Sequence, residues 1–518
     1  MTKPRSIRPR GAIAVLVVLV LVAAGCGSGS GTSSGSSQPP GTSSANATLR
    51  VVRTEGIDGW VLDSAATYAS YQTDAAVFEG LLRIKPDGSG TAAGLADTWS
   101  FDPASTSWTF HIRDNAAFSD GKPVTSADVV FSEKIWSAGK NFGSSYARIT
   151  SVDAPDPHTV VFHLSKPDNN FEALLSASVS GVMPNNFGGQ TEQNYYANPI
   201  GAGAYKIDKW SAGARIELSR NEHFYNSADG GPAKLNIDVV TDENERSILF
   251  QSGDAQIVEY VPAPAVKLYS DSDLAKLPVS QVLHLSMNVA SGPFSDTKVR
   301  TAVANAVDDQ QIIDGAYAGN AEKPSGILPP NLPGWAPPSK NYFTTDLDKA
   351  KALLAASSGA GGFKTEVIYD AGVASDALAA QIIKANLAPL GIDVTTTGLE
   401  TAAFLDRAFG TAAPMVLWTF GAVSPDIADP VNWISGTGWL FSGFDTAALI
   451  DLSTAYSVAP ANSDEAKAAI TRIQDQAITD VPAVALAHFS VQHALASSVH
   501  GTFAPWGLYY YDELAIDG

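Results

Sequence analysis

Hydrophobic residues recur at every second position in several parts of the chain, a period that predicts half-buried strands. The clearest case is 108–112, where Trp, Phe and Ile alternate with Thr and His. The segments 158–164 and 235–239 alternate in the same way, and Leu49 and Val51 open a first strand. The apolar run 482–489, PAVALAHF, predicts a strand that is buried throughout.

Elsewhere the hydrophobic residues recur at spacings of three and four, which predicts helices with one buried face. These helices are expected over 299–313, 347–354, 375–390 and 466–477. A further strand is expected at 392–394, directly after the third of them. Helices that alternate with strands in this half of the chain favour α/β packing.

The stretch 199–225, PIGAGAYKIDKWSAGARIELSRNEHFY, predicts a turn that feeds a hairpin. We expect Gly201 and Gly203 to adopt backbone angles that are closed to other residues, just before the alternating pair Tyr205 and Ile207. The segment 211–213, Ser-Ala-Gly, then separates this strand from a second one.

The chain has 518 residues, too many for a single core, so two or three domains are expected. Lys and Arg number 33 against 53 Asp and Glu, for a formal charge of -20. A field of this sign repels phosphate backbones and anionic membrane surfaces, so nucleic-acid binding is not expected.

The N-terminus indicates export. Basic residues within 1–10 precede the apolar run 12–24, which is shorter than a membrane span and typical of a signal peptide. The run ends in Val-Ala-Ala-Gly-Cys, and Cys26 is the only cysteine. This ending resembles a bacterial lipobox, with Ala23 where leucine is usual. The resemblance implies a signal peptide at 1–25 and lipidation of Cys26; an unprocessed membrane anchor is the alternative.

The segment 27–47 is rich in Gly and Ser and has no large apolar residue, so it predicts a flexible linker. Within it, 31–35 matches the Gly-x-Ser-x-Gly pattern of hydrolases. That pattern requires a preceding strand and a following helix, and neither is predicted here. We interpret the match as fortuitous.

Three ordered stretches carry a family resemblance. The segment 94–131 combines the strand 108–112, a turn at Asp120-Gly121, and a capping box at 125–128, Thr-Ser-Ala-Asp. It is followed by the strand 158–164 and the stretch 199–225. In sequence and order these stretches resemble the family 5 extracytoplasmic solute-binding proteins of bacterial ABC importers.

The resemblance implies an α/β, two-lobe fold of the periplasmic-binding-protein type with an inserted subdomain. The implied domains are a main lobe of 48–90, 199–288 and 488–518, an inserted subdomain of 91–198, and a second lobe of 289–487. Chain crossings near Asn288 and His488 would form a hinge. The two lobes would rotate about this hinge and close on a ligand.

Residue patterns for catalysis are not recognised. The eight histidines form no recognisable metal-binding pattern, and there is no phosphate-binding or dinucleotide-binding glycine motif. Carboxylates are plentiful, and a glycosidase-like pair stays open as an alternative. We expect a binding protein without cofactor or metal rather than an enzyme.

The resemblance places the tyrosine-containing loop at the ligand cleft. The tryptophan-rich segment 415–439 combines apolar surface with a few carboxylates, which suits a pocket for varied side chains with one positive end. The candidate ligand-binding residues are Tyr68, Tyr71, Tyr146, Trp418, Thr419, Phe420, Asp426, Asp429 and Trp439. Trp433 is interpreted as a core residue. In peptide-binding relatives an aspartate shortly after the tryptophan holds the ligand's amino group. Here 419–421 reads Thr-Phe-Gly, so Asp426 or Asp429 is the candidate replacement.

The resulting hypothesis is a monomeric lipoprotein, anchored to the outer face of the cytoplasmic membrane through the lipid on Cys26. It would capture a small ligand, a short peptide above all, and deliver it to ABC transporter permease subunits. One alternative is the same scaffold with a non-peptide ligand, such as a metal complex, haem, a sugar or an opine. The others are a secreted hydrolase and a surface protein that signals or adheres.

Overall fold

The computed structural model describes residues 46–517 except 58, 65–66, 141, 228–230, 276, 409–412, 423, 429 and 432–446. The predicted signal peptide, Cys26 and the linker up to 45 lie outside the described residues. None of the described helices has the length and hydropathy needed to cross a membrane.

A six-stranded sheet contains the first strand of the chain, and its order is β17-β11-β1-β10-β9-β8. The strands are β1 (Thr48–Arg53), β8 (Tyr205–Ser211), β9 (Arg215–Arg220), β10 (Lys234–Val239), β11 (Ile257–Val258) and β17 (Ala494–Leu495). Strand β1 runs parallel to β10 and β11, and the other neighbours are antiparallel. The hairpin predicted within 199–225 is therefore confirmed as β8 and β9.

The two glycines before β8 lie against the C-terminal end of helix α1 (Tyr68–Val77). Neither has a positive φ, so the expectation of unusual backbone angles was wrong. A Cβ on Gly201 would lie 1.9 Å from the carbonyl oxygen of Val77, and one on Gly203 would lie 2.6 Å from that of Ala76. Glycine is needed here because two backbones approach closely.

The segment predicted as an inserted subdomain contains a four-stranded antiparallel sheet of order β4-β5-β7-β6. The strands are β4 (Ala96–Asp102), β5 (Ser107–Ile112), β6 (Ile149–Asp156) and β7 (Thr159–Leu164). Its helices are α2 (Ser126–Ala138), α3 (Gly143–Tyr146), α4 (Phe171–Leu174) and α5 (Glu192–Ala197). The predicted capping box at the start of α2 is confirmed, because Thr125 and Asp128 bond each other's backbone.

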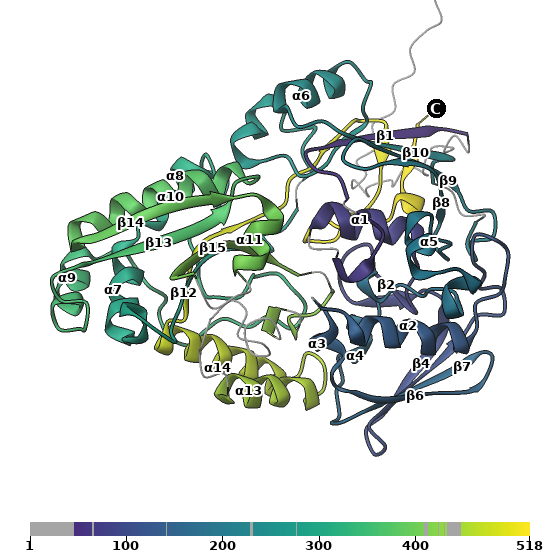
Figure 1. Cartoon of the computed structure of the whole chain (residues 1–518), viewed down its shortest axis with the longest axis horizontal. Helices are drawn as coiled ribbons and strands as arrows, with labels where there is room; N and C mark the ends of the chain where they lie inside the picture. The colour runs from purple at the N-terminus through teal and green to yellow at the C-terminus, as the bar shows by residue number, and fades with distance from the viewer. Residues whose placement is uncertain are drawn as a thin grey trace, which may run out of the picture. The chain divides into compact units, whose positions relative to one another are not determined.

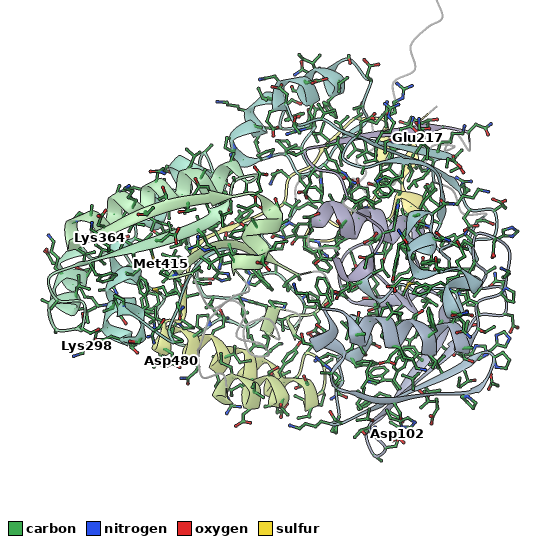
Figure 2. All side chains as sticks on the ribbon, viewed as in Figure 1. Asp102, Glu217, Lys298, Lys364, Met415 and Asp480 are labelled. Carbon is green, nitrogen blue, oxygen red and sulfur yellow. The ribbon has the colours of Figure 1, made fainter. Side chains whose placement is uncertain are left out.

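The second half of the chain forms a five-stranded sheet of order β14-β13-β15-β12-β16. The strands are β12 (Gln281–Met287), β13 (Phe363–Asp370), β14 (Ile392–Leu399), β15 (Met415–Gly421) and β16 (Ala483–Phe489). Helices α8 (Asp309–Ala316) and α10 (Ala374–Leu387) pack against it. Helices α13 (Ala447–Val458) and α14 (Asp464–Asp480) pack side by side (Figure 1). Met415 of β15, labelled in Figure 2, is fully buried in this core.

The remaining helices are α6 (Glu243–Gln251), α7 (Thr297–Ala306), α9 (Leu347–Ala355) and α11 (Thr401–Ala408). The short strands are β2 (Leu82–Ile84), β3 (Thr91–Ala93), β18 (Val499–His500) and β19 (Ala515–Ile516). The short 3-10 helices are η1 (Leu62–Ser64), η2 (Ser178–Ser180), η3 (Asn185–Gly189), η4 (Ala263–Leu268), η5 (Pro293–Ser295), η6 (Ala388–Leu390) and η7 (Tyr511–Glu513).

The single helix predicted over 299–313 is two helices, α7 and α8. Val307 takes extended backbone angles, and the side chain of Asp308 accepts a hydrogen bond from the backbone N–H of Gln311. An aspartate in this position caps a new helix. The hydrophobic period continued across the break because both helices bury one face in the same core.

The chain passes between the six-stranded and five-stranded sheets twice. The first passage lies between β11 and β12, so it precedes Gln281 and is not near Asn288 as predicted. The second lies between β16 and β17, close to His488 as predicted. These positions agree with a two-lobe α/β fold with a hinge, whereas the exact domain limits remain a proposal.

Candidate functional site

Tyr68 and Tyr71, predicted to lie in a loop, are in the first two turns of α1. The side chain of Thr67 caps this helix by accepting a hydrogen bond from the backbone N–H of Ser70. Tyr68 is partly exposed, whereas Tyr71 is buried against Phe142 and the edge of the Tyr68 ring. Tyr68 therefore packs at the edge of the core of the six-stranded sheet and keeps part of its surface exposed.

Tyr68 meets the other sheet. Its hydroxyl accepts a hydrogen bond from Nε2 of Gln281, the first residue of β12, at 2.6 Å. Gln281 pairs in register with Gly421, the last residue of β15. A Cβ at position 421 would lie 2.0 Å from the Tyr68 hydroxyl and 2.3 Å from Nε2 of Gln281. The absence of a side chain at Gly421 thus lets this polar pair sit on the strand ends.

The amide oxygen of Gln281 does not take part in the hydrogen bond with Tyr68. This atom, Oε1, is buried and has no hydrogen-bond partner among the described residues. A buried acceptor without a partner is costly, by roughly 1–3 kcal/mol. Such an atom, fixed in place by Tyr68, marks a position where a ligand N–H would be favourable.

Strand β15 carries three of the predicted residues. Trp418 is partly buried, and its ring packs against that of Phe404 in α11 with centroids 5.3 Å apart. Thr419 is also partly buried and pairs with Leu283. Phe420 is 4% exposed and belongs to a hydrophobic cluster. In this conformation Phe420 is a core residue, whereas Trp418 and Thr419 retain some exposed surface.

Asp426 is the one predicted carboxylate that the structure describes. The Tyr456 hydroxyl, in the last turn of α13, lies 2.9 and 3.1 Å from its two carboxylate oxygens and donates to them. The backbone N–H of Ala428 adds a third contact at 2.6 Å. Burial, and next the nearby Asp426 charge, raise the pKa of Tyr456, so its hydroxyl stays a donor. Asp429, Trp433 and Trp439 lie outside the described residues.

Tyr146 is 1% exposed and lies inside the segment predicted as the inserted subdomain. Its ring stacks on Trp136 with centroids 5.7 Å apart, and its hydroxyl shares a 2.7 Å hydrogen bond with Ser180. Because both its ring and its hydroxyl are occupied by these contacts, Tyr146 has a packing role in this conformation.

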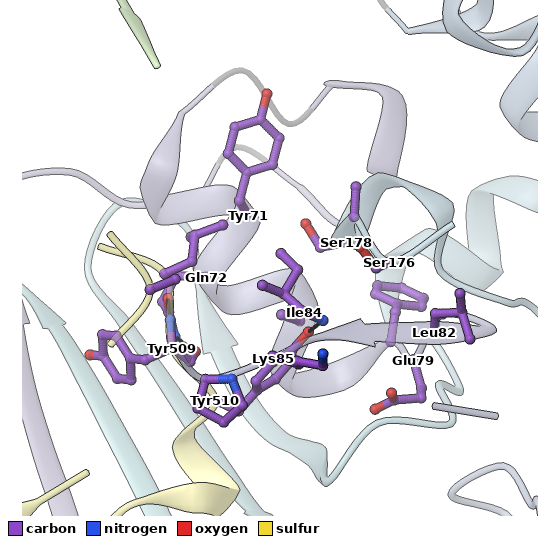
Figure 3. A pocket seen from close by; sticks show the side chains of 17 residues that line it. Tyr71, Gln72, Glu79, Leu82, Ile84, Lys85, Ser176, Ser178, Tyr509 and Tyr510 are labelled. Atoms are coloured by element: carbon purple, nitrogen blue, oxygen red, sulfur yellow. Dashed lines mark hydrogen bonds between the residues drawn. The ribbon is translucent and has the colours of Figure 1, made fainter. Parts of the chain in front are cut away.

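A pocket lies beside α1. Its walls come from α1, β2, η2 and the C-terminal segment 504–510, as Figure 3 shows. Tyr71 lines it together with residues that sequence reasoning missed, including Gln72, Lys85, Ser178, Tyr509 and Tyr510. The run of three tyrosines at 509–511 could have indicated this wall of the pocket, because consecutive aromatic residues are unusual on a solvated surface.

A buried network of charged and tyrosine side chains holds the first turn of α1 in place. Arg53 of β1 lies 3.5 Å from Glu259 and donates to the carbonyl oxygen of Ala69 at 2.9 Å. The hydroxyls of Tyr509 and Tyr511 donate to the same carboxylate oxygen of Glu259, at 2.5 and 2.7 Å. These contacts fix the start of α1 to the sheet and the C-terminal segment.

Beside the pocket, Arg83 binds Asp512 at 2.9 Å and lies 3.7 Å from Glu79. Its guanidinium also stacks 3.7 Å from the ring centroid of Tyr510. Burial raises the pKa of Glu79 to about 8, against the opposing effect of Arg83. Glu79 therefore holds its proton more readily than an exposed glutamate does.

The described residues include no group of three or more His, Cys, Asp or Glu side chains arranged to hold a metal ion. The buried histidines His284, His488 and His493 each bond a backbone carbonyl oxygen, those of Ile327, Gly326 and Gly507. Burial lowers the pKa of His284 and of His488 to about 4. Their backbone contacts hold the three rings in the interior of the protein.

Two sheets joined by two passages, with Tyr68 of α1 bonded to the first residue of β12, form a two-lobe arrangement. Residues 91–441 match the family model of bacterial extracellular solute-binding proteins, family 5 Middle. The chain belongs to this family.

Among its relatives is the dipeptide-binding protein of Escherichia coli K12, 24% identical over 511 residues, which cover 89% of this chain and 93% of the relative. The solved AgaA–agropinic acid complex from Agrobacterium tumefaciens R10 has a TM-score of 0.82 at 24% identity, covering 91% of this chain and 99% of that one. Helicobacter pylori DppA with the peptide STSA has a TM-score of 0.80 at 22% identity, covering 91% and 98%. These structures share the fold.

Proposed function

We propose that this chain captures short peptides outside the cytoplasm and delivers them intact to the permease of an ABC importer. The observation that carries the proposal is the Gln281 amide. Tyr68 fixes it from the other lobe, and its oxygen is buried without a partner among the described residues. A peptide N–H is a donor of the required kind, and the dipeptide-binding relative supports this ligand class.

The other proposed contacts follow from their positions. Tyr68, Trp418 and Thr419 contact the peptide, because they retain exposed surface at or near the strand ends. Asp426, oriented by Tyr456, holds the free amino group. The apolar part of the pocket beside α1, including Ile84 and Leu508, takes a side chain of the ligand. Closure of the lobes excludes water and creates the shape that the permease reads.

The chain is proposed to act as a monomer without catalysis or cofactor, tethered by lipid on Cys26. Replacing Cys26 by Ser removes the thiol that would carry the lipid, so a labelled fatty acid is expected to be incorporated into the parent chain and not into this variant. Equal labelling of the two chains would contradict the tether.

An opine or similar non-peptide ligand is the second candidate, favoured by the likeness to AgaA. Calorimetric titration of residues 26–518 separates the two. Di- to pentapeptides, agropinic acid, and metal or haem complexes are tested in turn. The peptide proposal expects saturable binding of peptides at one site per chain. Binding of the opine alone would reassign the ligand and retain the scaffold.

A further inference from the structure

Asn169 joins the segment predicted as the inserted subdomain to the last turn of α13. It lies between β7 and α4, far in sequence from its partners. Its backbone N–H donates to the carbonyl oxygen of Ser457 at 2.8 Å. Its side-chain nitrogen donates to the carbonyl oxygens of Val458 at 2.9 Å and Ala459 at 3.0 Å. A single residue thus supplies three donors to one helix end.

The chemistry of this helix end explains the contact. The last four carbonyl groups of an α-helix have no partner within the helix, and the helix dipole makes this end negative. Helix α13 has no basic residue in its last turn to compensate. The N–H groups of Asn169 therefore take the place of a C-terminal cap.

Asn169 is held ready for this contact by the residue before it. Asp168 is 3% exposed, and its carboxylate forms an ion pair with Arg148 and accepts the backbone N–H of Asn170 at 3.0 Å. The carbonyl oxygen of Asp168 accepts a hydrogen bond from Nε1 of Trp108 at 2.9 Å. Because the loop is fixed at Asp168, little conformational entropy is lost when Asn169 binds α13.

The same turn of α13 also carries Tyr456, which donates to Asp426. Asn169 and Asp426 are consequently connected through one turn of helix, with hydrogen bonds on both sides. Hydrophobic contacts in the same region link Tyr456 and Ile427 with Ile84 of β2 and Trp506.

We propose that Asn169 is a positioning residue that clasps α13 and so fixes the carboxylate of Asp426. This role rests on the proposed function, because it assumes that Asp426 belongs to the ligand site. The inserted subdomain then has a role in binding, since its loop 168–170 supports Asp426 from outside the ligand site.

The test is hydrogen exchange of the ligand-free mature chain, residues 26–518, with Asn169→Ala and Asn169→Asp. Loss of the two side-chain hydrogen bonds should raise amide exchange in 447–459 by about tenfold. Exchange in 424–428 should rise with it, because Asp426 loses its support. Asn169→Asp keeps the shape but replaces the donors by an acceptor facing carbonyl oxygens, so it should raise exchange at least as much as alanine.

Asn170→Ala is the matched control, since the side chain of Asn170 makes no hydrogen bond that the structure describes. It should leave exchange in both segments unchanged. If either Asn169→Ala or Asn169→Asp exchanges like the parent chain in these segments, Asn169 does not position α13. It would then have a packing role only. The measurement needs no ligand, so failure of the clasp is distinguishable from failure to bind peptides.

Discussion

The Tyr68 hydroxyl lies 2.6 Å from Nε2 of Gln281, and this hydrogen bond connects the first turn of α1 to the first residue of β12. Tyr68 lies in a helix and Gln281 in the five-stranded sheet, 213 positions apart in the chain. The contact leaves the amide oxygen of Gln281 buried, without a hydrogen-bond partner among the described residues.

Removing this amide should weaken peptide binding. Gln281→Ala deletes the acceptor, and Tyr68→Phe releases the amide from its fixed orientation. One hydrogen bond is worth about 1 kcal/mol, so each variant is expected to lower peptide affinity about fivefold to tenfold in calorimetric titration. The double variant should lose less than the sum of the two, because the residues act as a pair. Strict additivity would show that they act separately.

Gly421 should tolerate no side chain. In Gly421→Ala the added Cβ would meet the Tyr68 hydroxyl at 2.0 Å and displace it. Affinity is expected to fall by about tenfold, because the added Cβ also meets the Gln281 amide, at 2.3 and 2.4 Å, and displaces both members of the polar pair. Gly59→Ala is the control, since a Cβ there would meet nothing within 4 Å. Equal effects of the two glycine variants would argue against this contact.

Asp426 should matter only to ligands with a free amino group. A charge-assisted hydrogen bond contributes about 1.5–3 kcal/mol. Asp426→Asn is therefore expected to lower the affinity for peptides with a free amino group at least about tenfold. N-acetylated peptides should bind the variant and the parent chain equally. If acetylation makes no difference to the parent chain, Asp426 does not hold the amino group.

Acid should destabilise the five-stranded sheet through two histidines. Burial lowers the pKa of His284 and His488 to about 4, from an ordinary value of 6.5. Below about pH 6.5 the unfolded chain takes up protons that the folded chain refuses, so stability falls as the pH drops from about 6.5 towards 4. The slope is at most about 1.4 kcal/mol per pH unit for each histidine.

The replacements His284→Gln and His488→Gln keep a side-chain donor for the carbonyl oxygens of Ile327 and Gly326. Urea midpoints at about pH 7 and about pH 5 should differ less in these variants than in the parent chain. His500→Gln, at an exposed position, should keep the parental difference. If His284→Gln and His488→Gln show the same difference between the two urea midpoints as the parent chain, other groups determine its sensitivity to acid.

Local patterns predicted the strands well for a physical reason. Strands such as β5 and β10 bury one face, so hydrophobic and polar residues alternate along them with a period of two. Helix α1 was missed because residues on all of its sides are buried, which removes the helical period from 68–77. The available indication was Thr67, an N-cap residue just before it.

The site was predicted less completely than the fold because its parts come together over long sequence distances. Gln281 had no distinguishing pattern, and its role follows from Tyr68 and Gly421. The C-terminal wall of the pocket and the contact of Asn169 with α13 depend equally on tertiary packing. Glycines 201 and 203 were correctly singled out, but their reason is the approach of α1 and not their backbone angles.

The most direct test of the central claim is to incubate residues 26–518 with a mixed di- to pentapeptide library. The complex is then isolated by gel filtration, denatured, and its released ligand identified by mass spectrometry. The account predicts about one peptide per chain, enriched over the library and with its length unchanged. Shortened products would show a hydrolase, and the absence of retained peptide would contradict a peptide receptor.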